Sequence, residues 1–226
     1  MADTPAERFS RVQSQIAEAA HDSHRDPASI TTIVVTKFHP ASLVRELADA
    51  GVEHVGENRH QEAQAKHQEL ADVPLTWHFV GQLQSNKAKA VAQYCSVIHS
   101  LDRPSLTKAL AQSDQSLDVF LEINLTNVPG RGGAEPGDLV MLAEGVLEAP
   151  NLSLRGVMAV APVDEDPKKA FDRVLGYRED VLRLAPEATD LSLGMSGDFV
   201  EAISRGATHL RIGSAITGKR PDPTYP

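Results

Sequence analysis

Short apolar runs and longer amphipathic segments alternate along almost the whole chain. The first apolar run covers residues 30–36, and it is followed by a polar turn, a stretch with apolar residues at helical spacing and a closing glycine. The same order of features repeats, with glycine or proline as the stop, to about residue 218. Buried parallel strands that are each followed by a helix produce this pattern. The chain therefore predicts an α/β fold.

The repeated pattern gives each element an expected place. Strands are expected at residues 30–36, 54–56, 75–80, 96–101, 117–124, 153–160, 190–194 and 208–212. Helices are expected at residues 4–22, 40–51, 58–70, 85–94, 104–112, 136–148, 167–184 and 196–206, with one short turn after residue 213. Eight strands that alternate with helices, without a long linker, favour a closed (β/α)8 TIM barrel. An open doubly wound sheet is the alternative that the pattern leaves open.

A leading helix is expected before the barrel. Thr4 and Glu7 have the spacing of a capping box, with Pro5 at the first helical position. Apolar residues follow at helical spacing at Phe9, Val12, Ile16 and Ala19. We therefore expect a single domain over residues 1–226, with the helix at about 4–22, the barrel at about 30–218 and a proline-rich tail at 219–226.

Composition and charge narrow the choice of partner. With 226 residues and 41% apolar content, the chain can bury one sizeable core. The formal net charge is -9 and the lysines and arginines do not cluster, which argues against a nucleic-acid or anionic-membrane surface. We therefore expect a small-molecule partner.

The cysteine content and the N-terminus bear on the cellular compartment. Cys95 is the only cysteine, so an intrachain disulfide is impossible. The first residues carry neither a basic segment nor an apolar signal core. No apolar stretch approaches the roughly 20 residues that cross a bilayer. We therefore expect a soluble cytoplasmic protein.

Lys37 is the most informative candidate for chemistry, because it directly follows the first apolar run. In a parallel α/β barrel, the active site lies where the C-terminal ends of the strands meet the following loops. A lysine that closes the first strand then lies at the barrel mouth with its amine partly desolvated, and such an amine is a nucleophile for aldehydes. The alternative is a strand-end lysine that only extends its amine into solvent.

The loops after the seventh and eighth strands offer a site for a phosphate. Ser196 and Gly197 follow the seventh strand and open a helix, and Gly213 and Ser214 follow the eighth strand and open another. Barrels commonly bind phosphate there, through backbone N–H groups and the N-terminus of a short extra helix. Ordinary N-capping by each serine is the alternative. Together with Lys37, these turns point to a phosphorylated aldehyde, of which pyridoxal 5'-phosphate is the commonest in biology.

Several motifs carry a resemblance to a known family. They are Val-Thr-Lys at 35–37, Val-Gly-Glu-Asn at 55–58, Trp-His-Phe-Val-Gly-Gln-Leu-Gln-Ser-Asn-Lys at 77–87, Leu-Gly-Met-Ser at 193–196 and Arg-Ile-Gly-Ser at 211–214. In these segments the chain resembles the pyridoxal phosphate homeostasis protein family, in order from about residue 30 to residue 218. The resemblance implies a fold-type III pyridoxal phosphate barrel, similar to the N-terminal domain of alanine racemase but without the second domain of that enzyme.

The resemblance also implies roles for individual residues. Lys37 would hold the cofactor as a Schiff base, the internal aldimine, and Ser196, Gly213 and Ser214 would hold its phosphate. Arg211 would point toward the pyridine nitrogen and, because a guanidinium does not give up its proton, would keep that nitrogen unprotonated. The ring would then be a weaker electron sink than it is beside an aspartate, which restrains carbanion chemistry.

Three further residues have two interpretations each. Asn58 is a candidate cofactor contact, but with Gln61 it also fits a helix N-cap. His78 and Met158, in the third and sixth strands, are candidates for lining the cofactor ring, although a core position is the simpler account of each. The histidines form no metal-ligand set with a third donor, so no metal is expected.

Two residues depart from the family pattern. Arg59 follows the Gly-Glu-Asn triplet, where family members often have a tyrosine, and Arg131 lies in the loop after the fifth strand, where a lysine is common. Because a guanidinium does not form Schiff bases, Arg131 cannot relay the cofactor as a second lysine would. No role of that tyrosine carries over to Arg59.

Three functions fit these residues. The first is a carrier that binds pyridoxal 5'-phosphate reversibly for vitamin B6 homeostasis, without substantial catalytic activity, with recipient apoenzymes as the partners that the resemblance suggests. Racemases of this barrel type take a second base from a tyrosine of an extra domain, and this chain stops at Pro226 without one, which also makes a monomer the expectation. The second is a racemase-like enzyme that uses the same cofactor on an unknown amino acid. The third is a Schiff-base aldolase for a phosphorylated sugar.

Overall fold

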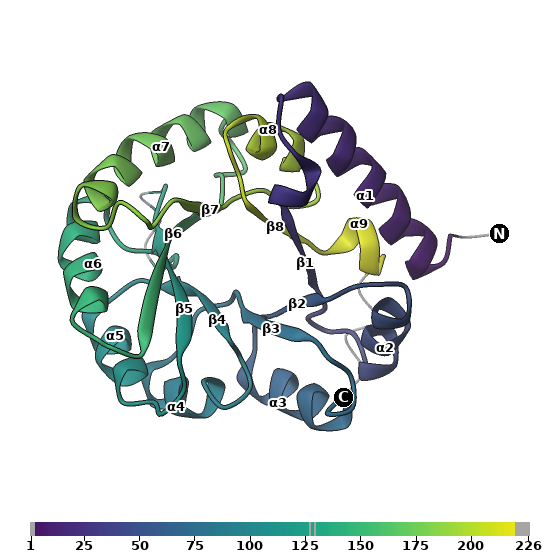
Figure 1. The fold of residues 1–226 in the computed structure, drawn as a ribbon, viewed down its shortest axis with the longest axis horizontal. Helices are drawn as coiled ribbons and strands as arrows, with labels where there is room; N and C mark the ends of the chain where they lie inside the picture. Colours follow the sequence, from purple (N-terminus) through teal and green to yellow (C-terminus); the bar gives the residue numbers. More distant parts are fainter. Residues whose placement is uncertain (1–2, 127, 129, 220–226) are drawn as a thin grey trace.

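The computed structural model describes residues 3–126, 128 and 130–219, and it is a closed barrel of parallel strands in the order β1 to β8 (Figure 1). The strands are β1 Thr31–Val35, β2 His54–Glu57, β3 Thr76–Phe79, β4 Val97–Leu101, β5 Leu117–Ile123, β6 Leu152–Ala159, β7 Asp190–Ser192 and β8 His209–Ile212. Because β1 pairs with β8 as well as with β2, the ring is closed. The predicted barrel is confirmed, and the open-sheet alternative is wrong.

Helices cover the outside of the ring (Figure 1). They are α1 Pro5–Asp22, α2 Ala41–Asp49, α3 His60–Glu69, α4 Ala88–Val91, α5 Pro104–Ala111, α6 Leu139–Leu147, α7 Pro167–Leu184, α8 Phe199–Ser204 and α9 Ser214–Thr217. Short 3₁₀ turns lie at η1 Pro27–Ser29, η2 Ser85–Lys87 and η3 Pro136–Asp138. The helices predicted over residues 85–94 and 136–148 each begin with one of these tighter turns.

The leading helix α1 covers the seam where β8 meets β1 (Figure 1). The predicted capping box is present, since the Glu7 N–H donates to Thr4 Oγ1 at 3.2 Å and the Thr4 N–H donates to the Glu7 carboxylate at 2.7 Å. Its apolar face is buried as predicted, at Phe9, Val12, Ile16 and Ala19. Through this face α1 packs against α2, α8 and α9, so the first and the last helix of the described residues are in contact.

Side chains of the strands divide between an outer shell and the barrel interior, because successive residues of a strand face opposite sides. Val34 packs in the shell beneath the helices. Val97, Phe120 and Met158 form a separate apolar cluster. Polar side chains are buried as well, including those of His78, His99, Ser192 and Arg211. The strands therefore enclose a mixture of apolar and hydrogen-bonded polar groups.

The helix predicted to open at Ser196 begins later than expected. The Asp198 carboxylate accepts the Met195 N–H at 2.6 Å, which holds residues 195–198 as a turn, and α8 starts at Phe199. The N-cap alternative for Ser196 is therefore wrong.

The helix predicted from residue 58 also begins later. α3 starts at His60, and Arg59 occupies the N-cap position without a side-chain hydrogen bond to the helix. Asn58 is therefore not an N-cap. Residues 220–226 of the predicted tail lie outside the described residues, and so does Pro129 in the loop after β5.

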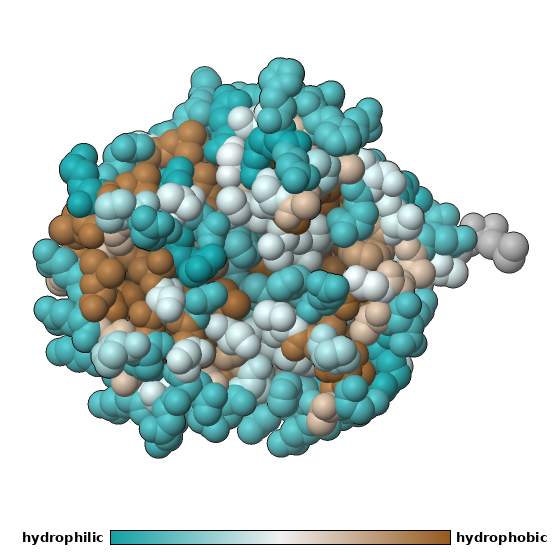
Figure 2. Space-filling view, in the orientation of Figure 1, coloured by the Kyte–Doolittle hydropathy of each residue, from teal (hydrophilic) through white to brown (hydrophobic). Residues whose placement is uncertain are grey.

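One apolar patch lies on the surface over α6 (Figure 2). Val140, Met141 and Leu147 are 37%, 47% and 53% exposed there. A groove of about 300 Å³ runs beside them between α5 and α6. Within the described residues, no helix combines the length and the apolar character needed to cross a membrane.

Candidate active site at the barrel mouth

Lys37 follows the C-terminal end of β1, as predicted. A Cβ added to Gly56 on β2 would lie 3.0 Å from Ile33 Cγ2 and 3.4 Å from Val35 Cγ2, so these two side chains share one face of the sheet. This face is the interior one, because Val34 packs in the shell. Lys37 continues the same alternation and is half-buried at the mouth.

The chain turns sharply after Lys37. Phe38 adopts a positive φ of 67°, a conformation that costs a residue other than glycine about 1–3 kcal/mol. The Phe38 N–H donates to Glu62 Oε1. Its ring centroid lies 5.9 Å from Lys37 Nζ and 4.9 Å from the guanidinium carbon of Arg59. These contacts fix the segment that presents the lysine, and Arg59 is one of the groups that hold it.

A buried ionic group supports this turn from α3. Lys66 Nζ donates to the carbonyl oxygen of Thr36 at 2.8 Å and to Glu57 Oε1 at 2.7 Å. Glu62 Oε1 accepts from the same Nζ at 2.8 Å, and Thr36 Oγ1 donates to Glu57 Oε1 at 2.7 Å. We call these four residues the Lys66 cluster. Sequence reasoning missed it, although Lys66 lies one helical turn from buried Ala63, on the face that α3 turns to the sheet.

Both members of the central ion pair of the Lys66 cluster are buried. The side chains of Lys66 and Glu57 are 7% and 0% exposed. Burial raises the pKa of Glu57, and the positive charge and hydrogen bond of Lys66 oppose this rise. Each charge therefore offsets part of the cost of burying the other, directly beneath the backbone that ends in Lys37.

Arg211 is held inside the barrel by β8 and is 5% exposed. Its Nη1 donates to the backbone oxygen and to the hydroxyl oxygen of Ser192, each at 2.6 Å, and its Nη2 donates to the Ala159 carbonyl at 2.8 Å. Burial lowers the pKa of Arg211 to about 10, and the charges of Glu122 and Asp198 oppose this shift, so the guanidinium keeps its proton at neutral pH. These bonds use one of the two Nη2 hydrogens and leave the other for a ligand.

The turns after β7 and β8 lie in contact, as the phosphate-site prediction requires. Ser196 Oγ accepts the Ala215 N–H at 3.3 Å. Gly213 is the N-cap of α9, without a side-chain cap, so capping is not the role of Ser214. Ser196 and Gly213 are half-buried and Ser214 is exposed, so a ligand can reach all three. A Cβ on Gly213 would lie 3.8 Å from Val35 Cβ, which places the turn beside the strand that ends at the candidate lysine.

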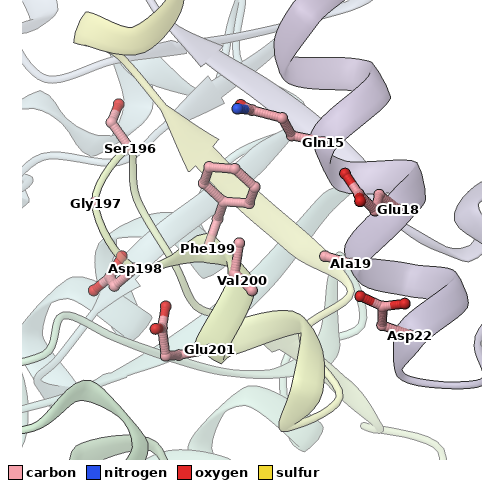
Figure 3. Close-up of a pocket in the computed structure, with 10 residues that line it drawn as sticks. All are labelled: Gln15, Glu18, Ala19, Asp22, Ser196, Gly197, Asp198, Phe199, Val200 and Glu201. Carbon is pink, nitrogen blue, oxygen red and sulfur yellow. The ribbon is translucent and has the colours of Figure 1, made fainter.

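A cavity of about 550 Å³ lies between the Ser196 turn and α1 (Figure 3). Glu18 and Asp22 of α1 line it on one side, and Asp198 and Glu201 line it on the other. Because carboxylates repel a phosphate, this cavity does not suit the predicted anion. The candidate lysine and the buried arginine are not among the residues that line it. The phosphate prediction therefore concerns the side of the turn that faces α9.

Asn58 follows β2, next to the strand that carries Lys37. It is half-buried, and its Oδ1 is buried without a hydrogen-bond partner among the described residues. It lines a cavity of about 460 Å³ together with Arg59, Gln82 and Lys87, among others. A buried acceptor without a partner costs about 1–3 kcal/mol, so Asn58 suits a ligand or a water that donates a hydrogen bond.

His78 and Met158 lie deeper than the mouth, at 2% and 1% exposure. Both ring nitrogens of His78 are occupied, since Nε2 lies 3.0 Å from His54 Nδ1 and Nδ1 lies 2.9 Å from His99 Nε2. Met158 packs in the apolar interior cluster. The core interpretation accounts for both residues. Among the described residues, no three His, Cys, Asp or Glu side chains are arranged to hold a metal ion.

Glu122 is a further candidate site residue, which sequence reasoning missed. It lies two residues after interior Phe120 on β5, so its side chain continues along the interior face toward the mouth. Burial, with the nearby charge of Asp102, raises the pKa of Glu122 to about 7, and the charges of Arg211 and Arg131 oppose the rise. Its Oε2 is buried without a hydrogen-bond partner in the described chain. An acidic residue among the apolar residues Phe120, Leu121 and Ile123 was the available signal.

The chain is similar to proteins of known name. A family model described as alanine racemase, N-terminal domain, matches residues 15–221. The pyridoxal phosphate homeostasis protein of Pseudomonas aeruginosa is 40% identical over 221 residues, which cover 96% of this chain and 96% of that protein. The protein of the same name in Corynebacterium glutamicum is 36% identical, with 93% of this chain and 99% of that protein covered.

Solved structures agree with these relationships. PipY of Synechococcus elongatus with PLP bound has a TM-score of 0.82 and 34% sequence identity. The match covers 95% of this chain and 100% of PipY. Alanine racemase of Corynebacterium glutamicum has a TM-score of 0.66 at 16% identity, and the match covers 63% of its length. At that identity the likeness shows the barrel fold alone.

Proposed function

This chain belongs to the pyridoxal phosphate homeostasis protein family, and we propose that it binds pyridoxal 5'-phosphate reversibly at Lys37 and so limits the free concentration of this aldehyde. The relative PipY has been solved with PLP bound. In this chain, one observation carries the proposal. Lys37 follows β1, Ser196 follows β7, and Arg211 is the second-last residue of β8, the strand that lies between those two in the sheet.

The covalent step uses the Lys37 amine. In its neutral form the amine adds to the aldehyde carbon, a C=N double bond forms, and the aldehyde oxygen leaves as water. Addition of water reverses the step, and no oxidant or reductant takes part. The contacts that hold Phe38 and the Lys66 cluster favour this reaction, because they fix the backbone on either side of the amine.

The other end of the ligand suits the turns after β7 and β8. In this proposal the phosphate is bound by the Ser196 hydroxyl and by the polar groups of Gly213 and Ser214, all of which a ligand can reach. The remaining Nη2 hydrogen of Arg211 then faces the pyridine nitrogen and keeps it unprotonated, since an arginine with a pKa of about 10 only donates at neutral pH. Asn58 contributes its unpartnered oxygen at the rim.

His78 and Met158 are assigned a position behind this site. Both are buried in the barrel below the residues that a ligand can reach. We therefore propose that they shape the interior behind the ring and form no hydrogen bond to the ligand.

We also propose that binding proceeds without substantial catalytic turnover. The curated relatives are named for homeostasis. Racemisation by two bases needs a second acid–base group across the ligand from Lys37. Tyr94 is a shell residue whose hydroxyl lies 3.1 Å from His60 Nδ1, and Tyr177 of α7 packs against the same shell. Tyr225 lies outside the described residues.

A racemase-like enzyme acting on an unknown amino acid is the second candidate, and Glu122 is the observation that favours it. A carboxyl group with a pKa of about 7, on the interior face near the mouth, has the properties of a general acid or base. A chiral assay over a panel of amino acids separates the two candidates. Racemisation above the rate of the free cofactor, abolished by Glu122→Gln, would favour the enzyme.

We further propose a cytoplasmic monomer that passes its ligand to recipient apoenzymes. A free, buried Cys95 suits a reducing compartment, and a net charge of -9 disfavours self-association. Light scattering on the purified protein tests the monomer. Transfer is tested by mixing the loaded protein with an apoenzyme of the same cofactor and following recovery of its activity.

The binding proposal is tested by titrating the purified protein with pyridoxal 5'-phosphate and recording absorbance. We expect a new visible band that saturates at one equivalent in the wild-type protein and in Lys89→Ala, an exposed control. Lys37→Ala should not develop this band. A Lys37→Ala protein with the wild-type band would refute the assignment of the lysine.

A further inference from the structure

A chain of hydrogen bonds crosses the barrel interior and ends at Arg211. His54 Nδ1 lies 3.0 Å from His78 Nε2, and His78 Nδ1 lies 2.9 Å from His99 Nε2. His99 Nδ1 lies 2.8 Å from Ser192 Oγ, which is also 2.6 Å from Arg211 Nη1. We call these five residues the histidine chain. They come from β2, β3, β4, β7 and β8, so five strands contribute one residue each.

The direction of these hydrogen bonds follows from Arg211. A guanidinium only donates, so Ser192 Oγ accepts from Arg211 and its own hydrogen needs another acceptor. His99 Nδ1 lies at 2.8 Å and provides it. His99 then carries its hydrogen on Nε2 and donates to His78 Nδ1, and His78 in turn donates through Nε2 to His54 Nδ1. Each histidine is therefore a neutral Nε2–H tautomer.

Burial supports the neutral state. His78 and His99 are 2% and 0% exposed, and loss of solvation lowers the pKa of each well below its usual range. The positive charge of Arg211 adds to this effect at His99. A protonated histidine would also have no acceptor to offer Ser192.

His99 is itself held in one orientation. Its ring stacks on Phe120 with the centroids 4.5 Å apart and the planes inclined by 8°. The His209 ring approaches the His99 ring edge-on, with the ring centroids 6.1 Å apart. Because His99 Nε2 is hydrogen-bonded to His78, His99 Nδ1 can face only Ser192. The Ser192 hydroxyl is thereby fixed, and its oxygen faces Arg211.

We propose that His99 is a positioning residue for Arg211, that it acts through Ser192 Oγ, and that His78 and His54 select the tautomer it needs. This proposal rests on the proposed function in one respect, since Arg211 is taken to face the ring of the bound ligand. The interior histidines then set the plane of the guanidinium at a site that none of them touches.

Two substitutions at position 99 separate positioning from packing. In His99→Asn, the side-chain oxygen can take the place of Nδ1 and accept from Ser192, while the contact to His78 is lost. In His99→Gln, the longer amide reaches toward His78 in the place of Nε2, and the Ser192 hydroxyl loses its acceptor. Both remove the ring that stacks on Phe120. If His99 only fills space, the two variants behave alike.

The first measurement uses the protein without ligand. Nitrogen-15 spectra should show Nε2–H tautomers for His78 and His99. Rotation of the Arg211 guanidinium should be as slow in His99→Asn as in the wild-type protein and faster in His99→Gln, in which the Ser192 hydroxyl is no longer fixed but the bonds to the backbone oxygens remain. Nδ1–H tautomers, or equal Arg211 signals in the two variants, would overturn the proposal.

The second measurement is the dissociation constant for pyridoxal 5'-phosphate. We expect His99→Asn to stay within about 2-fold of the wild-type protein and His99→Gln to bind about 10-fold more weakly, the effect of one lost hydrogen bond. Equal weakening of both variants would contradict a role through Ser192. A wild-type protein that binds no ligand would instead refute the proposed function, and the nitrogen-15 arm would still decide the positioning of Arg211.

Position 192 provides a second pair in case the variants at position 99 do not fold. Ser192→Thr keeps the hydroxyl, and Ser192→Ala removes it while the backbone oxygen still accepts from Arg211. Rotation of the Arg211 guanidinium should stay slow in Ser192→Thr and become faster in Ser192→Ala, where only the bonds to the backbone oxygens remain. Unchanged rotation in Ser192→Ala would overturn the proposal, because the histidines would then have no path to the guanidinium.

Discussion

Two buried polar networks support the barrel mouth, and they stabilise a buried cation in different ways. The Lys66 cluster lies behind Lys37 and consists of full charges that are paired at 2.7 Å and 2.8 Å. The histidine chain ends at Arg211 and consists of four neutral residues and this single cation. Among the described residues, no carboxylate forms an ion pair with that arginine. Its bonds go to oxygens of Ser192 and Ala159.

The difference teaches what each network can do. Removal of one member of a buried ion pair leaves the other charge buried without a partner. The Lys66 cluster is therefore critical for stability. A neutral hydrogen-bond chain loses only one bond when a member is changed, so the histidine chain can adjust orientation at a modest cost in stability. The first network holds the amine in place, and the second sets the direction of the guanidinium.

The largest expected effect is on the charged network. Lys66→Met leaves Glu57 buried without its cation and should lower the free energy of unfolding by about 3–5 kcal/mol. Urea denaturation measures this change, with exposed Lys89→Met as the control, for which less than about 0.5 kcal/mol is expected. Adding Glu57→Gln to Lys66→Met should restore part of the loss. A Lys66→Met protein as stable as the control would show that the pair contributes nothing.

The second effect concerns Glu122, whose charge acts on Arg211. Burial raises the pKa of Glu122 from 4.5 to about 7, so the folded protein holds this proton more tightly than the unfolded chain does. Its contribution to stability is complete below about pH 4.5 and is lost as the pH rises through about 7, a change of about 3 kcal/mol. Denaturation at several pH values should therefore give a flatter profile for Glu122→Gln than for the wild-type protein. Glu148→Gln, at an exposed position, should keep the wild-type slope.

A smaller effect is expected at Arg211, where the histidine chain ends. Arg211→Lys keeps the charge but loses the planar set of donors, so pyridoxal 5'-phosphate should bind about 10-fold more weakly. Exposed Arg183→Lys is the matched control and should leave the dissociation constant unchanged. Equal affinities for all three proteins would remove Arg211 from the ligand site.

The smallest effect is expected outside both networks. Arg131 is exposed, so Arg131→Lys should change the free energy of unfolding by no more than about 0.5 kcal/mol. Unlike arginine, lysine can form a Schiff base, and borohydride treatment should then label a minor fraction of the protein at position 131. A variant labelled at Lys37 alone would show that this loop does not reach the ligand.

The barrel and the mouth could be predicted from the sequence because their signals are local. Apolar runs, closing glycines and the Thr4–Glu7 capping box each lie within a few residues. The start of α8 was misjudged for an equally local reason, since Asp198 binds the Met195 N–H and delays the helix. Lys37 was predicted as a site residue because it follows a strand.

The two networks could not be predicted in the same way. The histidine chain joins residues as far apart as His54 and Ser192, and only closure of the barrel brings them together. Each histidine taken singly fits a core position. Lys66 gave a local signal, a charge on the buried face of α3, but its partner Glu57 lies on a different element. Pairing across strands and helices is a property of the fold.

The most direct test of the account is to identify the residue that holds the ligand. The protein is loaded with pyridoxal 5'-phosphate, the C=N bond is reduced with borohydride, and the labelled peptide is sequenced by mass spectrometry. The account predicts a single label on Lys37 that is absent without ligand. A label on Lys66, Lys87 or Lys89 with none on Lys37 would contradict it.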